Sequence, residues 1–395
     1  MADTHTTRSD PTDAHRRFVP YGRQWVDEDD VAAVLDVLRG DYLTTGPAVT
    51  RFEEALRAAT GAAHALSVNS GTSALHTAYA TAGIGEGDEI VTTPLTFAAT
   101  ANAAVMLGAS VRFVDVLPDT GNIDPAAVAR AITPRTRLIA AVDYTGHPAD
   151  YHALRPIADE HGLTLVADAA HSLGAAYHGR PVGTLGDLTT LSFHPVKVVT
   201  TAEGGAVLTD EPHLACRAAD FRTHGITKNP ARLTRPDEGA WYYEMQSLGY
   251  NYRLSDLQAA LGCSQMSRLS AFVTRRRQIA ARYASALADI DGLIRPAVRE
   301  GVEPAWHLYV VRCREKSRRR AFFDALRARG LGVQVHYIPV HTQPFYRDLG
   351  WRQGDLPVAE AFYAGAVSLP IFPAMSDAEV DYVIQQVHDA AAEVL

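Results

Sequence analysis

Short apolar runs alternate with helix-like stretches from about residue 51 onward. Apolar runs bounded by turn residues predict buried strands, and apolar residues spaced by three or four positions predict helices. The expected strands are residues 64–68, 89–92, 111–114, 138–142 and 163–167, and residues 72–82 form an expected helix. This alternation predicts βα units around a mostly parallel sheet, and therefore an α/β fold. Such sheets bind ligands outside the carboxyl ends of their strands.

The second part of the chain has a different pattern of apolar and polar residues. A long helical pattern runs from 255 to about 288, followed by expected strands at 308–312 and 332–337 and helices at 319–329 and 377–395. Because a single core stops growing at about 250 to 300 residues, a chain of 395 residues predicts two domains. We expect a disordered tail at 1–17, a large domain at 18–255, and a linking helix with a smaller C-terminal α/β domain at 256–395.

Charge and cysteine content narrow the possible functions. The formal net charge is -8, whereas nucleic-acid binding depends on clustered Lys and Arg, so no nucleic-acid partner is expected. The three cysteines are widely spaced, which argues against a disulfide framework or a thiolate metal site, and no metal is expected. The first seventeen residues are polar, with neither an apolar signal core nor a membrane span. A cytoplasmic protein without a membrane partner is the expectation.

Lys197 is the first residue with a candidate chemical role. Lysine occurs only at 197, 228 and 316, and Lys197 follows an apolar run and stands beside three valines. Partial desolvation lowers the pKa of such an amine and favours the neutral form that attacks a carbonyl. A surface lysine at a strand end is the more common situation for this local pattern, so both interpretations stay open.

Two further motifs follow expected strands. Asp168 ends an apolar strand three residues before His171. A carboxylate at this position could pair with the protonated nitrogen of a cofactor that contains a pyridine ring. A helix N-cap is the alternative for Asp168, and a polar residue at the cleft edge is the alternative for His171. Residues 68–73, Val-Asn-Ser-Gly-Thr-Ser, combine a strand end, a glycine turn and a helix start. Free backbone amides at a helix N-terminus can hold a phosphate.

Taken together, the motifs resemble the DegT/DnrJ/EryC1/StrS family of sugar aminotransferases over about residues 18–395. The matching stretches are Asn-Ser-Gly-Thr-Ser-Ala-Leu at 69–75, Asp-Ala-Ala-His at 168–171, Ser-Phe-His-Pro-Val-Lys at 192–197, Glu-Gly-Gly at 203–205 and Asn-Tyr-Arg at 251–253. The resemblance implies a pyridoxal 5'-phosphate (PLP) enzyme of aminotransferase fold type I. It also implies a homodimer with shared active sites.

The resemblance assigns roles to individual residues. Lys197 would hold PLP as a Schiff base and move protons, Asp168 would pair with the pyridine nitrogen, and His171 would lie near the ring hydroxyl. Phe97 would stack on one ring face, with Ala170 behind the other. The phosphate would contact Gly71, Thr72 and Ser192, with Asn251 reaching it from the partner subunit. One departure from the family is Ala202, where glycine is common before Glu203, which puts the local backbone geometry in doubt.

Within the family, the chain is most similar to the UDP-4-amino-4,6-dideoxy-N-acetyl-β-L-altrosamine transaminases of pseudaminic acid biosynthesis. That similarity implies L-glutamate as donor and a UDP-linked 4-keto-6-deoxy-N-acetylhexosamine as acceptor. The expected substrate-binding residues are Tyr21, Leu43, Thr44, Thr45, Gly46, Arg253, His336 and Tyr337. For Trp306 and His307, a role in substrate binding and packing of the small domain both stay open, and Tyr309 could also simply pack the small domain.

Three alternative functions remain at this point. A TDP-linked or 3-keto nucleotide sugar would use similar PLP chemistry. A PLP-dependent sugar dehydratase usually replaces the Schiff-base lysine, which is present here. A non-catalytic PLP-fold sensor usually carries a DNA-binding domain, and the segment before residue 18 is too short for one.

Overall fold

The computed structural model describes residues 18–395, and the expected disordered tail at 1–17 lies outside the described residues. A seven-stranded sheet forms the centre, in the order β2-β10-β9-β6-β5-β3-β4. Only β10 runs antiparallel to its neighbours, so the predicted mostly parallel sheet is confirmed. The strands are β2 (His64–Val68), β3 (Glu89–Thr92), β4 (Ser110–Phe113), β5 (Thr136–Val142), β6 (Thr164–Asp168), β9 (Leu188–Ser192) and β10 (Gly205–Thr209).

Both faces of this sheet are buried. In β6, Leu165 and Ala167 point into one apolar cluster and Val166 into another, as expected for side chains that alternate along a strand. The same alternation explains why the strands read as continuous apolar runs in the sequence. The helices and the sheet thereby form the layered α/β architecture expected for the fold. The helices up to α7 are α1 (Glu28–Arg39), α2 (Pro47–Thr60), α3 (Gly71–Ala82), α4 (Ala99–Val105), α5 (Pro125–Ala131), α6 (Tyr151–His161) and α7 (Pro212–Arg222).

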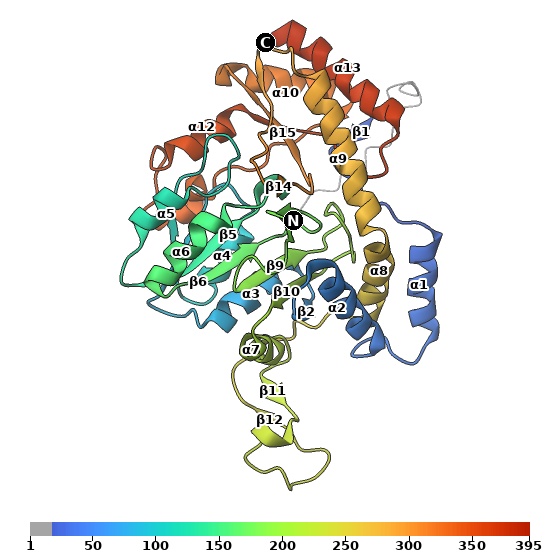
Figure 1. Cartoon of the computed structure of the whole chain (residues 1–395), viewed down its shortest axis with the longest axis vertical. Coiled ribbons are helices and arrows are strands. Elements are labelled where there is room, and N and C mark those ends of the chain that lie inside the picture. Colours follow the sequence, from blue (N-terminus) through green and yellow to red (C-terminus); the bar gives the residue numbers. More distant parts are fainter. Residues whose placement is uncertain (1–17) are drawn as a thin grey trace.

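The C-terminal elements form a second apolar cluster beside the sheet, at the top of Figure 1. A three-stranded sheet in the order β13-β15-β17 packs there against α9, α10 and α13. These strands are β13 (Leu293–Ile294), β15 (Tyr309–Cys313) and β17 (Ala366–Leu369). The helices in this part of the chain, of which only α9, α10 and α13 contribute to the second cluster, are α8 (Asp256–Ser267), α9 (Leu269–Ala286), α10 (Arg319–Ala328), α11 (Pro344–Asp348), α12 (Pro357–Gly365) and α13 (Asp377–Val394).

Two predictions for this part were wrong in detail. The long helix expected at 255–288 is divided into α8 and α9 at Arg268, whose guanidinium forms salt bridges with Asp27, the N-cap of α1, and with Asp30 in that helix. The strand expected at 332–337 is reduced to β16 (Leu331–Gly332) and an isolated bridge at Gln334. Beyond it, the carbonyl of His336 accepts a hydrogen bond from the Tyr144 hydroxyl instead of a neighbouring strand. The segment therefore bends over the end of the central sheet.

Short strand pairs connect distant parts of the chain. β1 (Val19–Pro20) pairs with β16, and β14 (Val302–Glu303) pairs with β7 (Ala176–Tyr177), which also pairs with β8 (Arg180–Pro181). The hairpin of β11 (Ile226–Thr227) and β12 (Glu244–Met245) projects from the body at the bottom of Figure 1. Across residues 18–395, every helix is too short or too polar to cross a membrane.

Candidate active site

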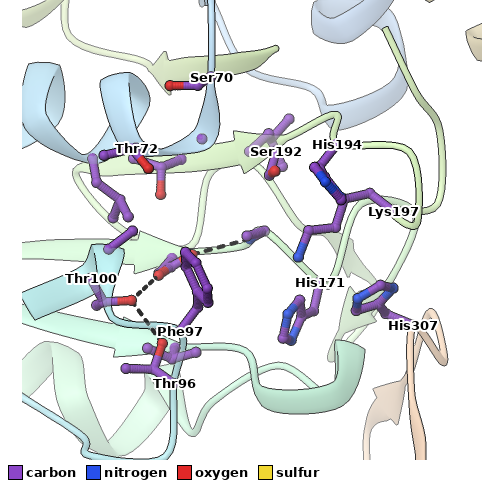
Figure 2. Close-up of a pocket in the computed structure, with 18 of the residues that line it drawn as sticks. Ser70, Thr72, Thr96, Phe97, Thr100, His171, Ser192, His194, Lys197 and His307 are labelled. Carbon is purple, nitrogen blue, oxygen red and sulfur yellow. Dashed lines mark hydrogen bonds between the residues drawn. The ribbon is translucent and has the colours of Figure 1, made fainter. Parts of the chain in front are cut away.

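A cavity of about 450 Å³ lies at the carboxyl ends of the parallel strands. The loops after β2, β3, β6 and β9 all contribute residues to it, because parallel strands end at the same edge of the sheet. Figure 2 shows Lys197 extending into the space between Ser192, Phe97 and His171. The predicted residues that line the cavity are Tyr21, Gly71, Thr72, Phe97, Asp168, Ala170, His171, Ser192, Lys197, His336 and Tyr337.

The N-terminus of α3 forms one wall. Ser70 caps the helix, with its hydroxyl oxygen accepting from the Ser73 amide at 3.0 Å. The amides of Gly71 and Thr72 belong to the first helical turn, where N–H groups have no partner within the helix. A Cβ at Gly71 would lie 2.9 Å from the side chain of Ser192, so glycine is needed for this close approach. Two amides and a hydroxyl group are thereby brought together in a site suited to an anion.

The amine of Lys197 occupies the middle of the cavity. Burial lowers its pKa to about 8, and the negative charge of Asp168 opposes part of the shift. The side chain is enclosed by protein but partly open to the cavity. Its neutral form is therefore accessible near neutral pH, as a nucleophilic lysine requires.

Asp168 also lines the cavity and is buried among hydrogen-bond donors. Its Oδ2 accepts from the Thr100 hydroxyl at 2.6 Å, and its Oδ1 accepts from the Ala170 amide at 3.3 Å. Burial raises the pKa of the carboxyl group, whereas these two hydrogen bonds and the charge of Lys197 lower it. The carboxylate is thus held in place while facing the cavity.

Histidine and tyrosine side chains complete the wall beside Lys197. His171 Nε2 lies 3.0 Å from the Tyr337 hydroxyl, and the His171 ring centre is 4.4 Å from that of His307. Burial lowers the pKa of His171 and His307 well below the usual value, and that of His336 to about 4. All three imidazoles are therefore neutral at pH 7 and offer hydrogen bonds without charge.

Comparison with known proteins accounts for this arrangement. A model of the DegT/DnrJ/EryC1/StrS aminotransferase family matches residues 24–388. The spore coat polysaccharide biosynthesis protein SpsC of Bacillus subtilis is 41% identical over 377 residues, which cover 94% of this chain and 97% of SpsC. The chain belongs to the DegT/DnrJ/EryC1/StrS aminotransferase family.

Solved structures of similar proteins agree with this family assignment. Helicobacter pylori PseC, an aminotransferase involved in the biosynthesis of pseudoaminic acid, matches with a TM-score of 0.89 at 32% identity, over 95% of this chain and 100% of PseC. The PLP form of Spr1654 from Streptococcus pneumoniae matches with a TM-score of 0.90 at 29% identity, over 96% of this chain and 100% of that one. The protein is a PLP-dependent sugar aminotransferase of fold type I.

The residues of the cavity fit the family's cofactor. An amine of lowered pKa, a buried carboxylate and free helix amides correspond to the aldehyde, the pyridine nitrogen and the phosphate of PLP. Phe97 is 62% exposed and lies at the cavity wall, where a ring can cover it. Each part of the cofactor therefore has a chemically matched group within one cavity.

Some residues expected from the family resemblance lie outside the cavity of a single chain. Leu43, Thr44 and Thr45 are exposed, and the Gly46 amide donates to Asp256 Oδ2 at 2.7 Å. Asn251, which was expected to reach the partner's cofactor phosphate, and Arg253, which was expected to bind substrate, form isolated bridges with Thr223 and Val68. Their roles stay predictions.

The cavity is also lined by residues outside the list of expected site residues, among them Thr96, Thr100, His194 and His307. Thr96 and Thr100 flank Phe97, but a threonine near a helix start has many ordinary roles. His194 lies inside the lysine motif without having been assigned a function. His307 reaches the cavity from the segment before β15, and its place in Trp-His-Leu-Tyr at 306–309 was the available signal.

Proposed function

We propose that the protein transfers an amino group from L-glutamate to the C4 keto group of a UDP-linked 4-keto-6-deoxy-N-acetylhexosamine. The observation that carries this proposal is the Lys197 amine facing the same cavity as the Asp168 carboxylate and the N-terminus of α3. PseC, which is similar over nearly its full length, supports an acceptor from the same chemical class.

Each residue would have a defined task. PLP, when bound, supplies an electron sink for breaking bonds at the carbon that carries the amino group. Lys197 would hold the cofactor and then accept and return a proton at Nζ. Asp168 would accept the hydrogen bond of the pyridine N–H, and His171 would lie near the ring hydroxyl. The phosphate would be bound by Gly71, Thr72 and Ser192, and the ring would lie between Phe97 and Ala170.

The outer cavity suits the uncharged part of a sugar. His336 is held by a hydrogen bond between its Nδ1 and Ser368 Oγ at 2.8 Å, and its ring centre lies 5.3 Å from that of Tyr21. Because burial lowers the pKa of His336 to about 4, the imidazole is neutral and can bond a hydroxyl or an acetamido group. A pocket with aromatic walls and few polar groups is typical of ligand sites that fix orientation in this way.

The charge of the cavity supports a homodimer with shared active sites. Among the described residues that line it, Lys197 is the only lysine or arginine. The cofactor phosphate, the glutamate carboxylates and the sugar diphosphate are all anions, and buried anions need paired cations or donors. Asn251 and Arg253 of the partner subunit would supply them.

Exposed apolar side chains also support this assembly. Val31, Leu35 and Leu38 stand at helical spacing on α1 and are exposed, as are Trp241 and Met245 on the projecting hairpin. Apolar side chains that are exposed together on one face of a helix, as on α1, mark association surfaces. A closed two-fold dimer is the commonest arrangement for such chains.

The substrate is tested with the PLP-loaded enzyme. L-Glutamate alone should change the absorbance spectrum of the bound cofactor, and the UDP-linked 4-keto sugar should reverse the change and gain an amine by mass. TDP-linked and 3-keto sugars serve as competing acceptors. Reversal by a TDP-linked sugar without an acetamido group, but not by the UDP sugar, would contradict the proposed acceptor. The aminotransferase activity itself would still be supported.

The shared site is tested by mixing two inactive variants. Lys197→Ala and Asn251→Ala subunits should form heterodimers in which one site has both wild-type residues. Random pairing makes half the dimers heterodimers with one working site of two, so about one quarter of wild-type activity should return. If Asn251 served its own subunit, no site in the mixture would be complete, and confirmed heterodimers would stay inactive.

A further inference from the structure

Two threonine hydroxyl groups form a short chain that ends on Asp168. The Thr100 hydroxyl lies 2.6 Å from Asp168 Oδ2, and the Thr96 hydroxyl lies 2.7 Å from that of Thr100. Both threonines are buried, with 1% and 3% of their surfaces exposed. Figure 2 shows Thr96 and Thr100 joined by a dashed line between their hydroxyl groups, close to Phe97.

Chemistry sets the direction of this chain. An ionised carboxylate only accepts hydrogen bonds, so the single proton of the Thr100 hydroxyl is donated to Asp168. The Thr100 oxygen must then accept from the Thr96 hydroxyl. A hydroxyl that receives a hydrogen bond is polarised and donates more strongly, so Thr96 strengthens the bond from Thr100 to the carboxylate.

The backbone around Thr100 is itself fixed. The Tyr79 hydroxyl of α3 donates to the Thr100 carbonyl at 3.0 Å, and the Thr100 amide donates to the Phe97 carbonyl at 3.3 Å. The helix that carries the phosphate-binding amides therefore also anchors the residue that holds the carboxylate. Phe97 and Asp168 are placed relative to each other by the same segment.

The hydrogen bond has an electrostatic consequence. Burial raises the pKa of Asp168, and the Thr100 hydroxyl, as the first of the opposing influences, lowers it again. A carboxylate that must accept a pyridine N–H has to be ionised and correctly rotated. Thr100 contributes to both, since it stabilises the charge and occupies one carboxylate oxygen.

We infer that Thr100, supported by Thr96, is a positioning residue that holds Asp168 ionised and aligned for the pyridine nitrogen of bound PLP. The inference rests on the proposed role of Asp168. A threonine that merely satisfies a buried carboxylate need not affect the cofactor. A positioning residue must affect the cofactor, and it must do so through Asp168 alone.

The test compares Thr100→Val, which keeps the shape and removes the hydroxyl, with Thr100→Ser, which keeps the hydroxyl. Losing a hydrogen bond to a charged group should lower transamination turnover about ten- to a hundredfold in Thr100→Val. Thr100→Ser should recover most of this loss. Thr96→Val should show a smaller loss in the same direction, and it supplies a second variant if Thr100→Val does not fold.

Two readouts separate positioning from a structural role. The ¹⁵N chemical shift of ring-labelled PLP should move toward that of unprotonated pyridine in Thr100→Val and toward the wild-type value in Thr100→Ser. Adding Thr100→Val to Asp168→Asn should cost less than about twofold more turnover, since residues that act as a unit are not additive.

The outcomes are distinguishable from failure of the proposed function. If Asp168→Asn leaves turnover and the ring-nitrogen shift at wild-type values, the role of Asp168 is wrong and the inference falls with it. If Asp168→Asn is impaired, two results overturn the role of Thr100 alone. One is a wild-type turnover and ring-nitrogen shift in Thr100→Val. The other is an equal loss of turnover when Thr100→Val is added to the wild-type protein and when it is added to Asp168→Asn.

Discussion

Cofactor capture by the cofactor-free protein should depend on pH in a way that reports the environment of Lys197. Burial lowers the pKa of this amine from 10.5 to about 8. At pH 7, an amine with a pKa of about 8 is neutral in about one molecule in ten, and an amine of ordinary pKa in about one in three thousand. Because only the neutral amine attacks an aldehyde, burial should raise the reactive fraction about three-hundredfold.

The rate of capture can be followed by stopped-flow absorbance after mixing PLP with the cofactor-free protein. Below pH 8 the rate should rise about tenfold per pH unit, and above pH 8 it should level off as the amine becomes fully neutral. Nα-Acetyl-lysine is the matched control, because its side-chain amine has the ordinary pKa and its profile contains the titration of PLP itself. The ratio of the two profiles isolates the protein's contribution.

Asp168→Asn tests the sign of the coupling. The carboxylate favours the charged ammonium and raises the pKa of Lys197, so its removal should lower the pH at which the rate levels off. The ratio should be constant below pH 8 and fall above it, so a ratio that stays constant up to pH 10 would show that the Lys197 amine is solvated and has the ordinary pKa. A shift to higher pH in Asp168→Asn would show that the effect of the Asp168 charge on the Lys197 pKa has been assigned the wrong direction.

Three further outcomes are expected. Borohydride reduction of the PLP-loaded protein, followed by peptide mapping, should place the pyridoxyl group on Lys197, and labelling at Lys228 or Lys316 would contradict the assignment. Arg276 is buried and donates to three backbone carbonyls, so Arg276→Met should lower the free energy of unfolding by about 3 kcal/mol in a urea titration. Phe322→Ala should lower it by about 3 to 5 kcal/mol through a cavity in the C-terminal cluster, whereas an unchanged urea midpoint would place this residue outside a packed core.

The central fold could be predicted because the sheet is parallel and buried on both faces. Its strands are continuous apolar runs, and the expected ranges 64–68 and 89–92 coincide with β2 and β3. The C-terminal part was harder, since β16 and β13 are two residues long and give almost no periodic signal. At the break, Arg268 forms salt bridges with residues about 240 positions earlier, and no local pattern encodes such partners.

Candidate site residues were found where they directly follow a strand. Asp168, Ser192 and Gly71 stand at or just beyond the ends of β6, β9 and β2, so sheet geometry brings them together once the strands are parallel. His307 enters from the other side, on a segment whose path depends on how the C-terminal elements pack. Its position in the cavity could therefore not be derived from strand order.

Thr100 is a site residue that could not be predicted from the sequence, for a physical reason. Its hydrogen bond to Asp168 joins residues 68 positions apart, and it requires one rotamer of a side chain that is compatible with many surroundings. A carboxylate at a strand end can be recognised from the sequence, because burial of an unpaired charge is too costly to occur without function or compensation. The compensating donor can come from any neighbouring element, and here α3 fixes it through Tyr79. The charge of Asp168 therefore predicts that a hydrogen-bond donor lies beside it, and only the packing of α3 against α4 determines that this donor is Thr100.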